Sequence, residues 1–272
     1  MTGGGTVDQI ADYIFVRALA EGNHGQFFLA KPPARLPISA EHVAVKVLAG
    51  HTSEEAFRRA TKELRAFASV RSPYLVSLYD AGQDGGTFYY AMEYLPLGSL
   101  AAPARPLGRP EVLRAVAHAA RAAHALHESG VVHRDIKPAN VLITESGGKL
   151  SDLGLAQSLN PGMTMTGMGP IGSIEFIDPA ILRGGRASRA SDIWSLGMTL
   201  HRALAGTGAY GELPDTDPLL AMRRILSVEP TIDSNLPAEE RALIVACLAA
   251  DPVERPRTAE EFADRVEQMA AA

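Results

Sequence analysis

The segment His-Val-Ala-Val-Lys-Val-Leu (residues 42–48) alternates in a way that puts a small side chain and a cation on one face of a predicted strand. Successive side chains of a strand point to opposite faces, so Ala44 and Lys46 point one way and the valines the other. A small residue leaves room for a flat base, and the cation can reach phosphate groups beyond it. The pattern suits a nucleotide, although an exposed strand lysine would fit this short segment equally well.

A second segment, His-Arg-Asp-Ile-Lys-Pro-Ala-Asn (residues 133–140), is the most informative stretch of the chain. It matches H-R-D-x-K-P-x-N, and here the chain resembles the eukaryotic-type (Hanks-type) protein kinases, specifically the bacterial serine/threonine branch; a charged surface loop is the alternative. The resemblance implies that Asp135 accepts or orients the proton of the attacking hydroxyl and that Lys137 offsets the phosphoryl charge. It also makes Asn140 a Mg²⁺ ligand through its amide oxygen, a hard ligand for a hard cation. The lysine at 137 points to serine or threonine acceptors.

Two further charged residues are implied by the same resemblance. Ser-Asp-Leu-Gly (residues 151–154) resembles the Asp-Phe-Gly motif of the family with leucine for phenylalanine, so Asp152 would hold Mg²⁺ at the ATP phosphates. The strand that carries Lys46 matches the phosphate-binding strand. Its implied partner is Glu63 on the following helix, and such a pair orients the lysine more than it adds stability.

Residues 19–27 (Leu-Ala-Glu-Gly-Asn-His-Gly-Gln-Phe) resemble the glycine-rich loop G-x-G-x-x-G-x-V. Gly22 and Gly25 keep the freedom that brings backbone N–H groups close to phosphate. Ala20 replaces the first glycine, at a cost of about 1 kcal/mol if that position needs a positive φ. Phe27 replaces the valine and would cover the adenine. We expect these two departures to affect nucleotide affinity.

The remaining nucleotide contacts come from the segment Ala-Met-Glu-Tyr-Leu (residues 91–95), which resembles the connection between the lobes of the family. Met92 would lie at the back of the adenine pocket, backbone groups of Glu93 and Leu95 would bond the adenine edge, and Leu142 would form the floor opposite Ala44. The full predicted set is Leu19, Ala20, Gly22, Gly25, Phe27, Ala44, Lys46, Met92, Glu93, Leu95 and Leu142.

Residues 172–180 resemble G-T-x-x-Y-x-A-P-E, the end of the family's activation segment, with Ser173 keeping a hydroxyl that bridges to the catalytic Asp and Lys. Ala180 replaces a glutamate that in the family pairs with an arginine, here Arg255. Breaking one side of such a buried pair costs roughly 3–5 kcal/mol. We therefore expect Arg255 to find another partner, for which Asp178 is the candidate, or to lie in a wetter site.

The segment Met-Thr-Met-Thr (residues 163–166) lies where bacterial relatives autophosphorylate, which makes Thr164 and Thr166 candidate phosphorylation sites. Arg134 would receive the phosphate through a charge-assisted bond. Two ordinary loop threonines are the alternative. Asp192 resembles the family aspartate that holds the backbone of the catalytic loop.

The elements that must position these residues change in type along the chain. Residues 13–93 read mainly as strands, among them residues 75–79 and 87–93, with one helix after a capping-box pattern at residues 52–55. Helical patterns cover residues 111–128, 191–205, 218–226, 237–250 and 258–269. His118, His124 and His127 lie on the first of these helices, where solvent or core roles are favoured over a metal site.

Composition bounds the class of protein. The 272 residues are 46% hydrophobic and 21% charged, which excludes collagen, coiled coil and wholesale disorder. A net charge of −5 argues against a nucleic-acid binder, and a single cysteine, Cys247, excludes a disulfide-framed secreted domain. The longest apolar run, residues 242–250, is nine residues long where about twenty are needed to cross a membrane.

Together these observations predict an α+β, bilobal protein-kinase-like fold. Residues 1–12 form a flexible tail, residues 13–94 an N-lobe with a five-stranded antiparallel sheet and one helix, and residues 95–272 a mainly helical C-lobe; the kinase domain itself spans residues 13–269.

The implied activity is transfer of the γ-phosphoryl group of ATP, with Mg²⁺ or alternatively Mn²⁺, to Ser or Thr of protein substrates, with autophosphorylation. We expect no nucleic-acid partner, no membrane insertion within the chain, and a weak homodimer for autophosphorylation. The expected location is the cytoplasm, either free or as the cytoplasmic part of a longer membrane-anchored protein.

The sequence leaves two other functions open. A pseudokinase, which keeps the fold as a nucleotide-binding scaffold for protein interactions, is favoured by Ala20 and Ala180 and opposed by the intact catalytic set. A small-molecule phosphotransferase would share the catalytic loop, but Lys137-Pro138 and the activation-segment match argue against it.

Overall fold

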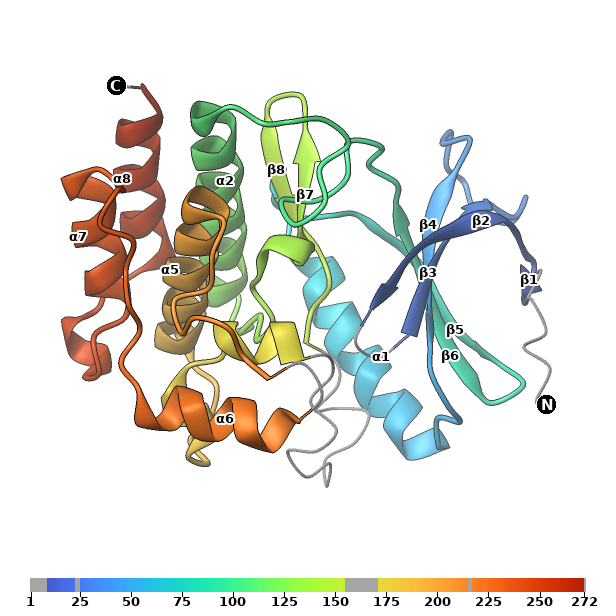
Figure 1. Cartoon of the computed structure of the whole chain (residues 1–272). Helices are drawn as coiled ribbons and strands as arrows, with labels where there is room; N and C mark the ends of the chain where they lie inside the picture. Colours follow the sequence, from blue (N-terminus) through green and yellow to red (C-terminus); the bar gives the residue numbers. More distant parts are fainter. Residues whose placement is uncertain (1–8, 23–24, 155–170, 215–216, 272) are drawn as a thin grey trace. The chain divides into compact units, whose positions relative to one another are not determined.

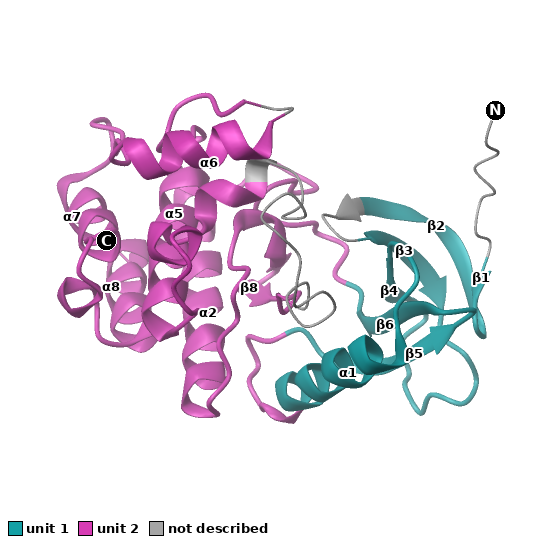
Figure 2. Ribbon diagram, turned by 90° about the horizontal axis from the view of Figure 1, so that it is seen from below, with its two compact units in different colours: residues 1–68, 76–94, 155–161 teal, residues 69–75, 95–154, 162–272 magenta. Residues whose placement is uncertain are grey.

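The structure is a computed structural model that describes residues 9–22, 25–154, 171–214 and 217–271. The chain divides into two compact units (Figure 2). Unit 1 comprises residues 1–68, 76–94 and 155–161, and unit 2 comprises residues 69–75, 95–154 and 162–272. Strands dominate the first unit and helices the second.

Unit 1 is built on an antiparallel sheet with the strand order β1-β2-β3-β4-β6-β5 (Figure 1). The sequence predicts five strands, and the sixth, β1, is only two residues long. It pairs with β2 inside the segment predicted to be a flexible tail, and the N–H of Ala11 donates to Asp84 Oδ2 at 2.7 Å. The end of that segment is therefore attached to the sheet, while residues 1–8 lie outside the described part. The strands are β1 (Gln9–Ile10), β2 (Tyr13–Gly22), β3 (Gly25–Lys31), β4 (Val43–Leu48), β5 (Leu78–Asp84) and β6 (Thr87–Glu93).

The central strand β4 follows the predicted alternation. Val43 and Val45 are fully buried in an apolar cluster that includes Tyr13 and Tyr89, and Val47 packs against the same cluster. Ala44 and Lys46 therefore occupy the opposite face, as the sequence predicts.

One helix, α1 (Glu54–Ser69), belongs to unit 1 and buries Ala56, Ala60, Leu64 and Phe67 at helical spacing. The predicted capping box at residues 52–55 does not form, because Ala56 stands where a capping box needs a glutamate or glutamine. The helix begins at Glu54, so Ser53 is the residue that caps it, and its Oγ accepts from the N–H of Ala56 at 3.3 Å.

Unit 2 consists mainly of helices, with one short hairpin that packs against α2 (Figure 1). Helix α2 packs against α5 and α8, and α7 packs against both α5 and α8. The helices are α2 (Arg109–Glu128), α4 (Pro179–Leu182), α5 (Arg189–Ala205), α6 (Pro218–Ser227), α7 (Ala238–Cys247) and α8 (Ala259–Ala271). The remaining elements are the 3₁₀ turns η1 (Pro138–Asn140), η3 (Ile171–Phe176) and η4 (Pro252–Glu254), and the antiparallel strands β7 (Val141–Thr144) and β8 (Gly147–Leu150).

Helices α2 and α5 form the interior of unit 2. The alanines of α2 from Ala115 to Ala123 have no exposed surface, so neighbouring elements approach its backbone closely. In α5 every residue from Ser191 to His201 is buried, including Asp192. A charged residue in such a position must be paired or hydrogen-bonded.

Among the residues that the structure describes, no helix combines the length and the apolar character needed to cross a bilayer.

Candidate active site

The side chain of Asp135 is the centre of a polar cluster in the segment between α2 and β7. One of its carboxylate oxygens, Oδ2, accepts from Lys137 Nζ and from Asn140 Nδ2, both at 2.9 Å. Asn140 Nδ2 also donates to the backbone carbonyl of Asp135 at 2.7 Å. The side chains of Lys137 and Asp135 are 9% and 35% exposed, respectively. The carboxylate is thus fixed from its buried side and reaches the surface on the other.

Lys137 connects this cluster to η3. Its ammonium donates to Ser173 Oγ at 3.2 Å in addition to the Asp135 carboxylate. The bridge that the sequence predicts from the Ser173 hydroxyl therefore exists toward the lysine. It ties the cluster to the segment that ends at α4.

Asn140 and Asp152 are brought to adjacent positions by the β7–β8 hairpin. The N–H and the Oγ of Ser151 both donate to the backbone carbonyl of Asn140, at 2.9 Å and 3.1 Å. The two N–H groups of the Asn140 carboxamide point to oxygen acceptors of Asp135, which fixes the amide orientation and leaves Oδ1 as an acceptor. A carboxamide oxygen and a carboxylate are the hard donors that a divalent cation such as Mg²⁺ prefers, so these two residues fit such an ion.

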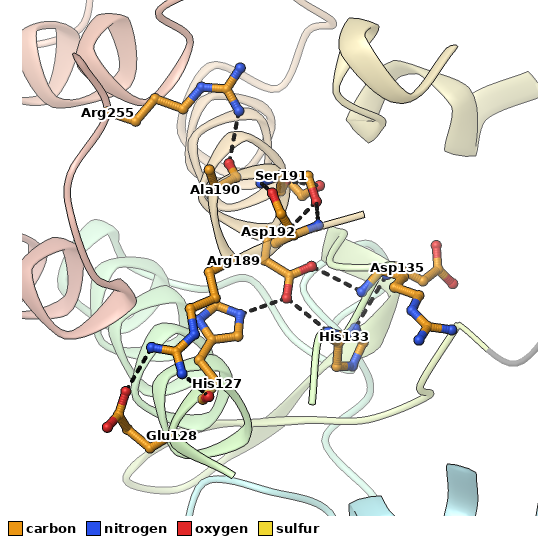
Figure 3. A network of polar contacts seen from close by, with 12 residues as sticks. His127, Glu128, His133, Asp135, Arg189, Ala190, Ser191, Asp192 and Arg255 are labelled. Atoms are coloured by element: carbon orange, nitrogen blue, oxygen red, sulfur yellow. Dashed lines mark hydrogen bonds and ion pairs between the residues drawn. The ribbon is translucent and has the colours of Figure 1, made fainter. Parts of the chain in front are cut away.

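The backbone of the segment is held by Asp192, a buried residue of α5 (Figure 3). Its two carboxylate oxygens accept from the N–H groups of His133 at 2.8 Å and Arg134 at 2.9 Å. Arg134 has a φ of +72°, a left-handed conformation that is unfavourable for a non-glycine residue. The two hydrogen bonds to a buried carboxylate offset that cost. This is the role that the sequence resemblance implies for Asp192.

A histidine that the sequence does not distinguish completes this contact. His127, at the end of α2, is buried, and its Nε2 lies 2.7 Å from Asp192 Oδ2. Arg189 on α5 donates to the backbone carbonyl of the same histidine, so α2 and α5 are joined at this point (Figure 3). The expected core role of His127 is therefore confirmed, and its imidazole contacts the aspartate that holds the backbone of residues 133 and 134.

His133 hydrogen-bonds to the backbone of Asp135 and to that of Ser151, the residue before Asp152. It has no exposed surface, its Nδ1 accepts from the N–H of Asp135 at 3.3 Å, and its Nε2 donates to the Ser151 carbonyl at 3.0 Å. Only the neutral imidazole with a proton on Nε2 can make both bonds. Burial lowers the pKa of His133 and favours that neutral form.

Arg255 has a carboxylate partner although residue 180, which carries the partner in the family pattern, is alanine. Arg255 Nη1 donates to Asp178 Oδ2 at 2.5 Å and to the Ala190 carbonyl at 2.8 Å. Both partners of the ion pair are buried. The other oxygen of Asp178 accepts from the N–H of Ala180 at 2.9 Å and so caps α4. The candidate partner is therefore the actual one, and a carboxylate two residues upstream replaces the missing glutamate.

The predicted nucleotide contacts in unit 1 lie mainly on three adjacent strands. Ala44 pairs with Met92 across β4 and β6, and both are buried. Lys46 pairs with Phe27 on β3. Glu63 is a half-buried residue of α1, and its ion pair with Lys46 remains a prediction.

Two positions of the glycine-rich segment differ from expectation. Ala20 lies in β2 opposite Phe27 and does not have a positive φ, so the cost considered for it does not arise. A Cβ at Gly25 would lie 2.1 Å from the carbonyl oxygen of Val47, so a glycine is required there by the close approach of β4. That requirement exists independently of any phosphate. Leu19 is half-buried at a bulge of β2, and Gly22 ends that strand.

The remaining predicted residues have the following positions. The N–H of Glu93 donates to the Ser77 carbonyl at 2.9 Å, so the contact predicted from Glu93 to an adenine would have to use its carbonyl. Leu95 and Leu142 are half-buried residues of unit 2. Thr164 and Thr166 lie outside the described residues.

The comparison with known proteins agrees with this geometry. A family model described as the protein kinase domain matches residues 13–266. The serine/threonine-protein kinase PknA of Mycobacterium tuberculosis is 34% identical over 271 residues, which cover 95% of this chain and 61% of PknA. PrkC of Bacillus subtilis, also named a serine/threonine-protein kinase, is 29% identical over 259 residues, covering 92% of this chain and 39% of PrkC. The chain thus spans about three fifths of PknA and a smaller part of PrkC.

A solved structure shows the same fold. The kinase domain of Mycobacterium tuberculosis PknI, as its C20A mutant, superimposes with a TM-score of 0.72 at 24% sequence identity, and the match covers 100% of both chains. The predicted α+β fold, with an antiparallel sheet and a mainly helical second part, is thereby confirmed.

Proposed function

Because the chain belongs to the protein kinase domain family, we propose that it transfers the γ-phosphoryl group of ATP to serine or threonine hydroxyls of proteins. The observation that carries the proposal is the arrangement of Asp135. Its carboxylate is held by Lys137 Nζ and Asn140 Nδ2 through one oxygen, and it is partly exposed. Such an arrangement leaves the second oxygen to receive a proton from an incoming hydroxyl.

The proposed step is a displacement at phosphorus. The hydroxyl oxygen of the acceptor forms a bond to the γ-phosphorus, the bond from that phosphorus to the β,γ-bridging oxygen breaks, and ADP leaves with the electron pair. The hydroxyl proton goes to Asp135. The Lys137 ammonium, which already contacts that carboxylate, stabilises the negative charge of the phosphoryl group, and positioning supplies most of the catalysis.

Asn140 and Asp152 would hold the divalent cation, for which we propose Mg²⁺ with Mn²⁺ as the alternative. When bound, such an ion neutralises phosphate charge and orients the leaving group. The protein prepares this site by fixing the carboxamide of Asn140 through two N–H bonds and by joining Ser151 to the Asn140 carbonyl. Asp152 itself has a φ of +64°, a strained conformation of the kind that is concentrated at functional sites.

The nucleotide side of the proposal rests on unit 1. We assign the phosphate contact to Lys46, with Glu63 to orient it, and the adenine pocket to the residues predicted from the sequence, Ala44, Met92 and Leu142 among them. Lys137 supports a serine or threonine acceptor, and its contact with Ser173 joins the proposed catalytic cluster to η3.

We also make proposals about phosphorylation sites, domain bounds and location. Thr164 and Thr166 are proposed as autophosphorylation sites that a weak homodimer would reach in trans. The kinase domain is proposed to span residues 13–269, with lobes at 13–94 and 95–272. A cytoplasmic location, free or as part of a longer membrane-anchored protein, is proposed as well.

The test is transfer of labelled phosphate from ATP to protein acceptors, including the chain itself, followed by identification of the modified residue type. We expect labelled serine or threonine with the wild type and none with Asp135→Asn or Lys46→Met. A matched control is Asp264→Asn, which changes an exposed aspartate on α8. Nucleotide binding without any transfer would support a pseudokinase, and labelling of small molecules alone would support a small-molecule phosphotransferase; either result would overturn the proposal.

A further inference from the structure

Three residues on adjacent strands of unit 1 form a row across the sheet. Phe27 on β3 is the direct partner of Lys46 on β4, and Lys46 is in turn the direct partner of Tyr90 on β6. Direct partners in antiparallel strands place their side chains on the same face. The lysine assigned to the phosphates is therefore flanked on both sides by an aromatic side chain.

The ammonium group lies over both rings. Lys46 Nζ is 4.8 Å from the centroid of the Phe27 ring and 5.9 Å from that of Tyr90. Both distances lie within the roughly 6 Å range of a cation–π interaction, in which the negative face of the ring attracts the cation. Tyr90 is 2% exposed and Phe27 is half-buried. Partial removal of water from the rings strengthens such an attraction.

From this geometry we infer that Phe27 and Tyr90 are positioning residues for Lys46. They hold the ammonium over their ring faces and so present a lysine whose flexible side chain is already ordered before phosphate arrives. The inference rests on the proposed function, because it deepens the role assigned to Lys46. It also differs from the expectation that Phe27 serves to cover the adenine.

The physical reason lies in the side chain of lysine. It is a compact charge on a flexible four-carbon stem, and ordering it on binding costs conformational entropy. A group that is pre-organised in the free protein avoids that cost at the moment of binding. A valine at position 27, the residue of the family pattern, has no ring face and cannot hold the cation in this way.

The first test varies the charge distribution of one ring at nearly constant shape. Phe27 is replaced by phenylalanines with increasing fluorination, and the affinity for a fluorescent ATP analogue is measured directly on the full chain. Fluorine weakens the negative ring face, so we expect the affinity to fall progressively, by about 3- to 10-fold over the series, as loss of a cation–π contact predicts. In a Lys46→Met background the dependence should disappear.

A matched control is available on the same strand. Phe28, the next residue of β3, points to the opposite face and stacks on Phe15 with a centroid distance of 4.0 Å. Fluorination at Phe28 should leave nucleotide affinity unchanged. An affinity that is constant or rises along the Phe27 series would overturn the inference, because the rings would then be inert or would compete with phosphate for the ammonium.

The second test needs neither nucleotide nor activity. The five lysines of the chain are labelled by reductive ¹³C-methylation, which keeps their charge, and the Lys46 signal is assigned with Lys46→Arg. We expect ring currents to shift this signal upfield of that of the exposed Lys62, with much of the shift lost in Phe27→Leu and retained in Tyr90→Phe. A shifted signal without nucleotide binding would contradict the proposed function. A signal at the position of the exposed lysines, with normal ATP binding, would overturn the positioning inference alone.

Discussion

The segment of residues 133–140 in unit 2 and the strands β3 and β4 in unit 1 are stabilised in different ways. Residues 133–140 are held by buried polar atoms, above all by the carboxylate of Asp192, which accepts two backbone N–H bonds. Strands β3 and β4 are held by their antiparallel pairing and by apolar packing on the sheet face opposite Lys46. A buried polar bond needs a particular atom at a particular place, whereas apolar packing needs only a similar volume. In line with this difference, the sequence matches the family motif closely at residues 133–140 and departs from the family pattern at Ala20 and Phe27.

The Asp178–Arg255 pair shows what a polar site requires when it changes. The residue at position 180 has lost its carboxylate, but a carboxylate oxygen still lies 2.5 Å from Arg255 Nη1. The carboxylate at Arg255 comes from a residue two positions upstream of position 180. The buried guanidinium of Arg255 therefore keeps a carboxylate partner although residue 180 is alanine.

The largest effect is expected on breaking this pair. Asp178→Ala leaves the buried guanidinium of Arg255 without its carboxylate and removes the cap of α4, so the free energy of unfolding should fall by about 3–5 kcal/mol. Urea denaturation measures the change. The matched control is Asp251→Ala, which removes only the exposed cap of η4. Adding Ala180→Glu to the first variant should restore part of the loss, and a wild-type midpoint for Asp178→Ala alone would show that the pair is not needed.

A smaller effect is expected for Asp192→Asn. The carboxamide keeps the volume but has one acceptor oxygen and no charge, so it cannot satisfy His133, Arg134 and His127 together. We expect a loss of about 2–4 kcal/mol in the free energy of unfolding and a larger relative loss of phosphoryl transfer, because Asp135 follows directly in the chain. Unchanged activity in this variant would mean that the segment keeps its conformation without the contact to α5.

Acid should weaken the same region through His133. Its pKa is lowered by burial, so the unfolded chain binds a proton at a pH where the folded chain does not, and stability is fully present only above the ordinary histidine pKa of about 6.5. The free energy of unfolding should therefore decrease as the pH falls below that value, with a contribution of at most about 1.4 kcal/mol per pH unit from this proton. Urea titrations at several pH values measure the slope, which should be smaller in His133→Gln. Equal slopes would assign the acid sensitivity to other groups.

The smallest effect is expected in unit 1, for Ala20→Gly. The backbone at Ala20 is an ordinary strand, so restoring the glycine of the family pattern should leave ATP affinity unchanged and cost about 0.5–1 kcal/mol of stability through chain entropy. Fluorescent nucleotide titration and urea denaturation check the two parts. A clear gain in affinity would show that the alanine limits nucleotide binding after all.

Much of the fold follows from local patterns in the sequence. The predicted strand over residues 87–93 coincides with β6, and the helices predicted from residues 111 and 191 correspond to α2 and α5, which begin two residues earlier. Residues 75–79 were expected to form a strand, but Leu75 pairs with Leu150 of β8 and the strand β5 begins only at Leu78. A short apolar run does not specify which element it will pair with.

The candidate site likewise contains some contacts that follow from the local sequence and others that do not. Asp135, Lys137 and Asn140 are close in sequence, so their spacing alone places them together. The contact of His127 with Asp192 joins residues 65 positions apart, and that of Phe27 and Tyr90 with Lys46 depends on strand register. Such contacts between distant residues depend on how the elements pack and are not encoded in a local pattern.

We propose that the Asp135 carboxylate, held by Lys137 and Asn140, takes the proton of the attacking hydroxyl. The most direct measurement is the single-turnover rate of phosphoryl transfer to a protein acceptor at saturating ATP, compared between the wild type and Asp135→Asn. Loss of a general base predicts a decrease of at least about 100-fold, with a urea midpoint close to that of the wild type. A rate for Asp135→Asn within a few-fold of the wild-type rate would contradict the claim.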